Sequence, residues 1–255
     1  AVLVLLRALG ENVPIDGIST PYAFACAFGS SVCVWLGMLM IHATLKRWFS
    51  ERASFLATVL LWLASPIIWY QIDQPWMSHA PSFFAAALVM WIWVRTSEAR
   101  SIAGWVALGA AIGLALLGRP THAVLILLPI ADLLRATKIN TNTKSTALGF
   151  LASCVSAAVV FIPQLAVWYY RYDWATNGVS TPPGSPMAYS HPAILEVLWS
   201  AHHGLFAWHP VLLAGFVGLL AFWKRARYAT LCIALLLVGY IYSNAAIDAW
   251  HAGGP

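Results

Sequence analysis

Residues 146–169 read TALGFLASCVSAAVVFIPQLAVWY and contain no charged side chain. A helix needs about 20 mostly apolar residues to cross the hydrocarbon core of a bilayer, so this stretch predicts a transmembrane helix. The whole 255-residue chain is 61% hydrophobic and only 9% charged, whereas soluble domains carry about 25% charged residues. A transmembrane barrel would instead show alternating segments of about 10 residues. The sequence therefore predicts an all-α, polytopic membrane protein.

Further apolar runs extend this pattern to a transmembrane helical bundle of about eight spans. The expected spans are 21–43, 53–71, 80–96, 102–118, 121–135, 146–169, 207–223 and 228–244. We expect residues 1–255 to form a single transmembrane domain, with an external segment at about 170–206. Because Ala1 stands inside an apolar run and Pro255 inside a loop-like stretch, we expect the chain to be a fragment truncated at both ends.

The distribution of charge predicts the orientation of these spans. Eleven of the 14 Lys and Arg residues lie in or beside four alternate loops, at 44–52, 97–101, 136–145 and 224–227. Cytoplasmic loops carry an excess of basic residues, so we expect these four loops in the cytoplasm. Histidines and acidic residues lie mostly on the opposite side, with Glu51, Glu98 and Asp132 as the acidic exceptions. We therefore expect function to face outward.

The net charge of +5 does not by itself indicate a nucleic-acid partner. Its basic residues are spread in small groups between apolar runs, whereas a protein that binds nucleic acid gathers its cations against phosphates. This distribution indicates contact with a lipid bilayer and no nucleic acid.

The motif GRPTH at residues 118–122 separates two expected spans on the side that is poor in basic residues. An ionised Arg119 at the edge of the hydrocarbon is costly, and such residues are often functional. Its planar fork of donors suits a phosphate group, and His122 follows three residues later. The alternative is that Arg119 only reaches the lipid headgroups as a membrane anchor.

The motif DQPWMSHA at residues 73–80 lies between the second and third expected spans. Pro75 interrupts a helix and Ser78 can cap the next one, so we expect Asp73 and His79 at a helix N-terminus. Backbone N–H groups at such a position favour an anion. The alternative is a capped turn in which Asp73 is merely solvated.

Two more motifs lie on the expected external side. WSAHHGLFAWHP at 199–210 contains His203, and DAWHAGGP at 248–255 contains Asp248 and Trp250. Adjacent histidines on a helix point about 100° apart, and no cysteine or spaced carboxylate accompanies them, so we expect no metal site. Elsewhere, the pair Gly109 and Gly113 predicts close helix packing.

Taken in order, DQPWMSHAPSFF, GRPTH, WSAHHGLFAWHP and DAWHAGGP resemble bacterial membrane glycosyltransferases of the GT-C class. The resemblance is to the protein O-mannosyltransferase and aminoarabinose-transferase-like group. It implies an enzyme of the bacterial inner (plasma) membrane that uses a polyprenyl-phosphate-linked sugar donor and needs no cofactor. It also implies transfer to an acceptor, whose identity stays unknown, on the extracytoplasmic face.

The resemblance also suggests roles for the motif residues. Arg119 would contact the lipid phosphate, because the growing charge of that leaving group needs cationic donors. The other substrate-binding residues that we expect are His79, Asp73, His122, His203, Asp248 and Trp250. The catalytic carboxylate is expected in an external loop before residue 1. We further expect residues 72–79, 119–122, 196–209 and 248–254 to converge on one external cavity.

Two other classes of protein stay open at this point. One is a transporter or flippase for a lipid-linked or anionic substrate, although such proteins usually show related halves with broken helices. The other is a non-catalytic membrane subunit. An acidic pair in an external loop that precedes these residues would favour the enzyme.

Overall fold

The computed structural model describes residues 9–10, 19–98, 100–138, 143–172, 187–202 and 204–247. Within these ranges the chain is almost entirely helical, and the only extended pairing is an isolated antiparallel bridge between Met187 and Ile247. The predicted all-α class is therefore confirmed. The chain divides into two compact units, residues 1–88 and 89–255, which are described separately below.

The first unit contains three helices and the first part of a fourth. They are α2 (Thr20–Leu45), α3 (Glu51–Leu63), α4 (Ile67–Ile72) and α5 (His79–Thr96), of which the last continues into the second unit. The Ser50 side chain accepts a hydrogen bond from the Ala53 N–H and so caps the start of α3.

The predicted single span at 53–71 is wrong, because the helix stops at Leu63 and resumes as α4. Pro66 lies at this break. Proline has no N–H to donate, and it disfavours helical geometry in the residue before it, here Ser65. The residues on both sides of the break are mostly apolar, so hydropathy alone predicted one continuous span.

The core of the first unit lies where α2 packs against α3, α4 and the start of α5. Val34, Met38 and Ala80 are buried there, with Trp62 packed against them. The Trp62 indole N–H donates to the Gln71 side chain at 2.9 Å, which ties α3 to α4 across the Pro66 break. An apolar cluster and polar contacts between helices thus both hold the unit together.

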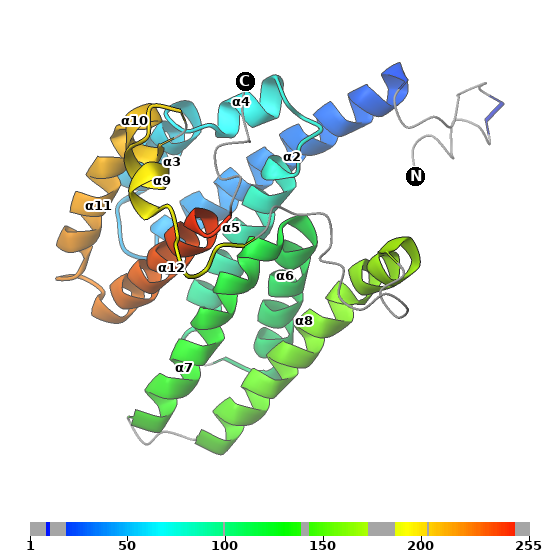
Figure 1. Ribbon diagram of the computed structural model, residues 1–255. Helices are drawn as coiled ribbons and strands as arrows, with labels where there is room; N and C mark the ends of the chain where they lie inside the picture. Colours follow the sequence, from blue (N-terminus) through cyan, green and yellow to red (C-terminus); the bar gives the residue numbers. More distant parts are fainter. Residues whose placement is uncertain are drawn as a thin grey trace. The chain divides into compact units, whose positions relative to one another are not determined.

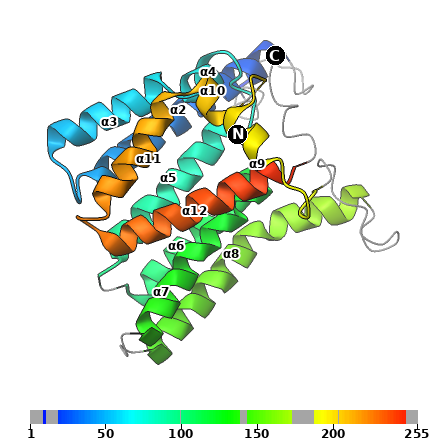
Figure 2. The same ribbon diagram turned by 60° about the vertical axis from the view of Figure 1, so that its left-hand side comes forward.

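The second unit contains the remaining elements (Figures 1 and 2). They are α6 (Ile102–Gly118), the 3₁₀ helix η1 (Pro120–Ile126), α7 (Leu127–Lys138), α8 (Thr143–Tyr172), α9 (Ile194–Trp199), α10 (Leu205–Trp208), α11 (Val211–Phe222) and α12 (Arg227–Ala245). The predicted span at 207–223 is also interrupted, because Pro210 separates α10 from α11.

Helices α6 and α8 run side by side in the second unit (Figures 1 and 2). A Cβ atom added at Gly113 would lie 2.6 Å from the Ala157 carbonyl oxygen, and one added at Gly109 would overlap the Ser153 carbonyl. The backbones therefore approach closely only because both residues are glycine, as small residues allow in membrane helices. The prediction of close packing at Gly109 and Gly113 is confirmed.

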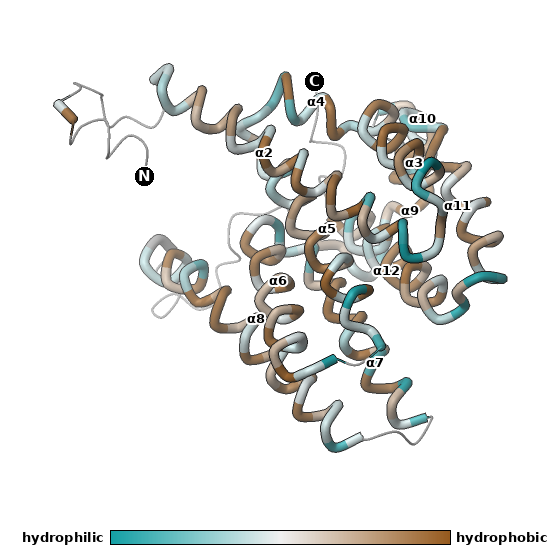
Figure 3. The backbone as a smooth tube through the Cα atoms, turned by 180° about the vertical axis from the view of Figure 1, so that it is seen from behind, coloured by the Kyte–Doolittle hydropathy of each residue, from teal (hydrophilic) through white to brown (hydrophobic). Residues whose placement is uncertain are grey.

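Four helical segments are long and apolar enough to cross a membrane among the residues that the structure describes. They are Thr20–Leu45, Pro120–Lys138, Thr143–Tyr170 and Arg227–Ala245, and shorter apolar helices cover Ile102–Gly118 and Val211–Phe222. Figure 3 shows hydrophobic residues along most of α6, α8 and α12. The expected count of about eight spans is not confirmed.

Large apolar side chains remain exposed along these helices. Phe24 and Phe28 of α2 are 71% and 73% exposed, and Leu220 of α11 is 76% exposed. A water-soluble protein rarely leaves such contiguous apolar surface uncovered. Together with the apolar spans, this exposure identifies an integral membrane protein whose helices face lipid.

Candidate functional site

Arg119 and His122 stand on a single turn that joins α6 to η1. Arg119 is half-buried and extended, with φ −154° and ψ 127°, and its N–H donates to the Ala115 carbonyl at 3.0 Å. Pro120 disfavours helical backbone geometry at the residue before it, Arg119, so α6 ends at Gly118. The His122 N–H then donates to the Arg119 carbonyl at 3.0 Å. The sequence thus places a cation and an imidazole one turn apart.

His122 contacts Tyr240 of α12. The residue is only 9% exposed, and its Nδ1 lies 2.6 Å from the Tyr240 hydroxyl. The two rings meet edge to face, with centroids 5.7 Å apart. A Cβ atom added at the neighbouring Gly239 would lie 2.7 Å from a methyl carbon of Val124, so glycine at 239 allows α12 to approach η1.

The second ring nitrogen of His122 has no such contact. Nε2 is buried and has no hydrogen-bond partner among the described residues. Buried polar atoms are almost always hydrogen-bonded in native proteins, and each exception needs an explanation. An unpartnered imidazole nitrogen beside Arg119 is the arrangement expected where a ligand completes the contact.

The chain before α9 is tied to the C-terminal end of α12, one to two turns beyond Tyr240. The Ala193 N–H donates to the Ala245 carbonyl at 2.9 Å, next to the bridge between Met187 and Ile247. The Tyr242 hydroxyl donates to the Tyr189 carbonyl at 2.8 Å. The start of η1, the end of α12 and the segment leading to α9 therefore share one end of the second unit.

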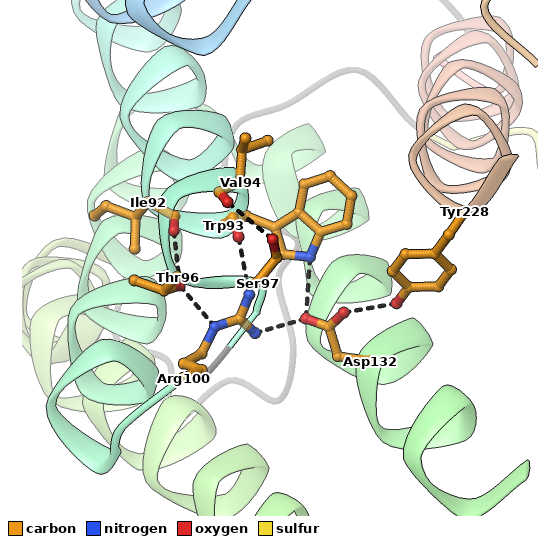
Figure 4. Close-up of polar contacts among 8 residues, drawn as sticks. All are labelled: Ile92, Trp93, Val94, Thr96, Ser97, Arg100, Asp132 and Tyr228. Carbon is orange, nitrogen blue, oxygen red and sulfur yellow. Dashed lines mark hydrogen bonds and ion pairs between the residues drawn. The ribbon is translucent and has the colours of Figure 1, made fainter. Parts of the chain in front are cut away.

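A second polar cluster occupies the opposite end of the η1–α7 and α12 pair (Figure 4). Asp132 of α7 accepts hydrogen bonds from the Trp93 indole at 3.0 Å, from the Arg100 guanidinium at 2.5 Å and from the Tyr228 hydroxyl at 2.6 Å. Asp132 lies ten positions after His122 along η1 and α7, and Tyr228 lies twelve positions before Tyr240 along α12. The two segments are antiparallel, with a polar contact at each end.

This second cluster was not predicted from the sequence, in which Arg100 and Asp132 stand out only as charges near expected cytoplasmic loops. Their side chains are in fact 5% and 15% exposed. A signal was present, since Asp132 stands in the apolar run LLPIADLL at 127–134 and an ionisable residue within such a run is seldom there by chance. Both carboxylate oxygens already accept hydrogen bonds, so the cluster is structural.

Asp73 and His79 belong to the first unit. His79 is the first residue of α5, as predicted, and its ring stacks on Tyr70 with centroids 3.6 Å apart. Asp73 is exposed and follows the C-terminus of α4, where its N–H donates to the Trp69 carbonyl at 2.8 Å. The predicted place of Asp73 at a helix N-terminus is therefore wrong. Gln74 lies outside both α4 and α5, and its side chain donates to the Asp73 carboxylate at 3.1 Å.

Three predicted site residues, His203, Asp248 and Trp250, lie outside the described residues. The structure brings Arg119 and His122 together, as their spacing predicted. It adds Tyr240, which no motif in the sequence distinguished from the other tyrosines at span ends. The predicted convergence of all four motifs on one cavity stays a prediction.

Comparison with known proteins places these residues in a family context. A family model described as dolichyl-phosphate-mannose-protein mannosyltransferase matches residues 18–168. This range covers α2 through most of α8 and includes both Arg119 and His122. No curated protein and no solved structure matches the chain.

Proposed function

The chain belongs to the dolichyl-phosphate-mannose-protein mannosyltransferase family, and on this basis we propose that it transfers a sugar from a polyprenyl-phosphate carrier to an acceptor on the extracytoplasmic face. The observation that carries the proposal within the chain is the turn from Arg119 to His122. It combines a guanidinium with a buried imidazole whose Nε2 has no partner among the described residues.

In the proposed reaction an acceptor hydroxyl attacks the anomeric carbon of the lipid-linked sugar. The new glycosidic bond forms as the bond between that carbon and the phosphate oxygen breaks, and the electron pair leaves with the lipid phosphate. Negative charge therefore grows on the phosphate, where fixed cationic and N–H donors stabilise the transition state most. Arg119 offers a planar fork for two phosphate oxygens, and His122 offers a neutral N–H.

The acceptor hydroxyl must also lose its proton, and a carboxylate is the natural base. Asp132 is excluded as this base, because its carboxylate already accepts hydrogen bonds from Trp93, Arg100 and Tyr228. In keeping with the family resemblance, we place the base outside the described residues. Asp73, Asp248, Trp250, His79 and His203 remain candidates for contacts with the sugar or the acceptor. These roles follow from the family resemblance of their motifs.

The orientation follows from the positive-inside rule. With the basic loops in the cytoplasm, the turn at Arg119 faces outward. We propose that the protein lies in a bacterial inner membrane, and that its group is that of the protein O-mannosyltransferases and aminoarabinose-transferase-like enzymes.

The test is transfer by the full-length protein in lipid nanodiscs. Polyprenyl-phosphate mannose and polyprenyl-phosphate aminoarabinose serve as donors, and mass spectrometry follows the released polyprenyl phosphate. We expect release that depends on the protein and on an acceptor from an extracytoplasmic extract. In liposomes, movement of an intact lipid-linked sugar across the bilayer without bond cleavage would overturn the proposal in favour of a flippase.

A further inference from the structure

The contact between His122 and Tyr240 can be made in two ways. Either the Tyr240 hydroxyl donates to Nδ1 of the imidazole, or a proton on Nδ1 is donated to the hydroxyl oxygen. The two arrangements place the proton of a neutral imidazole on different nitrogens. In the first the proton is on Nε2, and in the second it is on Nδ1.

The quality of the bond that is made distinguishes the two arrangements. Among the described residues the Tyr240 hydroxyl has no second hydrogen-bond partner, and Nε2 of His122 has none. Each arrangement therefore leaves one donor and one acceptor without a described partner. A phenolic O–H is a strong donor and the bare imidazole nitrogen a strong acceptor, whereas a phenol oxygen is a weak acceptor. The first arrangement, in which the hydroxyl donates to Nδ1, is therefore favoured.

The surroundings keep Tyr240 in place. Its backbone carbonyl accepts a hydrogen bond from the Asn244 side chain at 2.8 Å. Gly239 lets α12 lie close against Val124 of η1. The phenol ring meets the imidazole edge to face. The packing of α12 against η1 thus holds the hydroxyl within hydrogen-bond distance of Nδ1.

We propose that Tyr240 is a positioning residue that holds His122 with its proton on Nε2, so that this N–H donates to a phosphate oxygen of the lipid carrier. The identity of the acceptor oxygen rests on the proposed function, whereas the tautomer does not. An imidazole without this hydrogen bond would exchange between two tautomers and present a donor only part of the time. Favouring this tautomer makes Nε2 an uncharged donor for most of the time, one turn from Arg119.

The test uses the full chain labelled with ¹⁵N-histidine in nanodiscs at mildly alkaline pH. A ring nitrogen that carries a proton resonates far from one that does not, and loss of a signal in His122→Gln assigns the residue. We expect the wild-type protein to show His122 protonated predominantly on Nε2. Tyr240→Phe should shift the ratio of the two tautomers by about two- to tenfold, the size of one hydrogen bond.

Tyr242→Phe is the matched control, because it removes a tyrosine hydroxyl bonded to the Tyr189 carbonyl two residues further along α12. It should leave the His122 signals unchanged. Wild-type His122 protonated on Nδ1, or a Tyr240→Phe protein that keeps the wild-type tautomer, would overturn the proposal.

A titration with polyprenyl phosphate tests the ligand separately. We expect the Nε2 signal to move in the wild-type protein and in Tyr242→Phe. If the tautomer is as stated but the lipid moves no His122 signal, the assigned phosphate contact fails while the role of Tyr240 in setting the tautomer stands. If the lipid binds without perturbing His122 and transfer still occurs, the proposed function survives and this contact does not.

Discussion

Arg100 and Asp132 form a buried ion pair in which Nη1 of the guanidinium lies 2.5 Å from Oδ2 of the carboxylate. The same guanidinium donates to the Thr96 hydroxyl at 2.8 Å and to the Trp93 carbonyl at 3.1 Å. The pair therefore joins the end of α5 and the start of α6 to α7. Tyr228 adds α12 through its own hydrogen bond to Asp132. Four segments of the second unit meet at one carboxylate (Figure 4).

Replacing Asp132 with Asn should destabilise the protein strongly. Removing one partner of a buried ion pair leaves the other charge uncompensated, at a cost of about 3–5 kcal/mol. The measurement is the apparent melting temperature in detergent, read by tryptophan fluorescence. Arg100→Met together with Asp132→Asn should recover part of the loss, because it removes the orphaned charge. An Asp132→Asn protein as stable as wild type would show that the carboxylate is not needed as an anion.

The close approach of α6 and α8 gives a prediction with an internal control. Gly113→Ala would place a methyl group against the Ala157 backbone carbonyl, which cannot move aside. Overpacking of this kind costs about 1–3 kcal/mol. Gly215→Ala on α11 meets nothing within 4 Å and should be neutral or slightly stabilising. Equal melting temperatures for the two variants would contradict the packing.

Acid should weaken one contact in the first unit. The Lys46 ammonium and the His42 ring both hydrogen-bond to Glu51 and hold the pKa of that carboxyl below its ordinary value. A lowered native pKa means that the stabilisation is complete above about pH 4.3, the ordinary value for Glu. It is lost as the pH falls through the lowered native value.

Glu51→Gln measures this contribution. The difference in melting temperature between wild type and variant should be small, because Glu51 is exposed. It should also be constant near neutral pH and shrink towards zero on acidification below about pH 4.3. Added salt should reduce the difference at neutral pH. A difference that grew as the pH fell would contradict the assignment.

The orientation is testable by labelling single cysteines. We expect Ser97→Cys and Asn140→Cys to resist a membrane-impermeant maleimide added from outside intact cells, because the basic loops predict a cytoplasmic location. Ala123→Cys, beside the turn at Arg119, should react. The native cysteines at 26, 33, 154 and 232 are first replaced with alanine. Labelling of Ser97→Cys from outside would show that the predicted orientation is wrong.

Some features were readable from the sequence because they depend on local chemistry. The turn at Arg119 follows from Pro120, and the close helix contact follows from Gly109 and Gly113. The breaks at Pro66 and Pro210 were equally local, yet averaged hydropathy concealed them. Membrane helices tolerate proline often enough that a proline in an apolar run does not by itself predict a break.

The partners across the second unit were not readable, because they depend on packing between distant segments. Asp132 and Trp93 are 39 positions apart, and His122 and Tyr240 are 118 apart. Nothing in the residues themselves says which tyrosine of α12 meets which ring. Hydropathy predicts which helices exist, whereas their rotation and neighbours decide which polar groups pair.

Arg119 gives the sharpest prediction for activity. Its place before Pro120, on the face poor in basic residues, indicates a requirement for a fixed positive charge. Arg119→Lys keeps that charge but loses the planar fork. A contact made mainly in the transition state contributes about 2–4 kcal/mol, so we expect transfer from a polyprenyl-phosphate sugar to fall by roughly 30- to 1000-fold. Arg119→Ala should be at least as damaging.

The control is Arg95→Lys, because Arg95 is exposed at the end of α5 and lies over the Trp91 ring at 5.5 Å. It should retain wild-type turnover, and all three variants should melt near the wild-type temperature. A fall in kcat with little change in KM for Arg119→Lys would identify a contact that strengthens in the transition state. If Arg119→Lys and Arg119→Ala both turn over at the wild-type rate, Arg119 anchors the protein to lipid headgroups and other residues hold the phosphate.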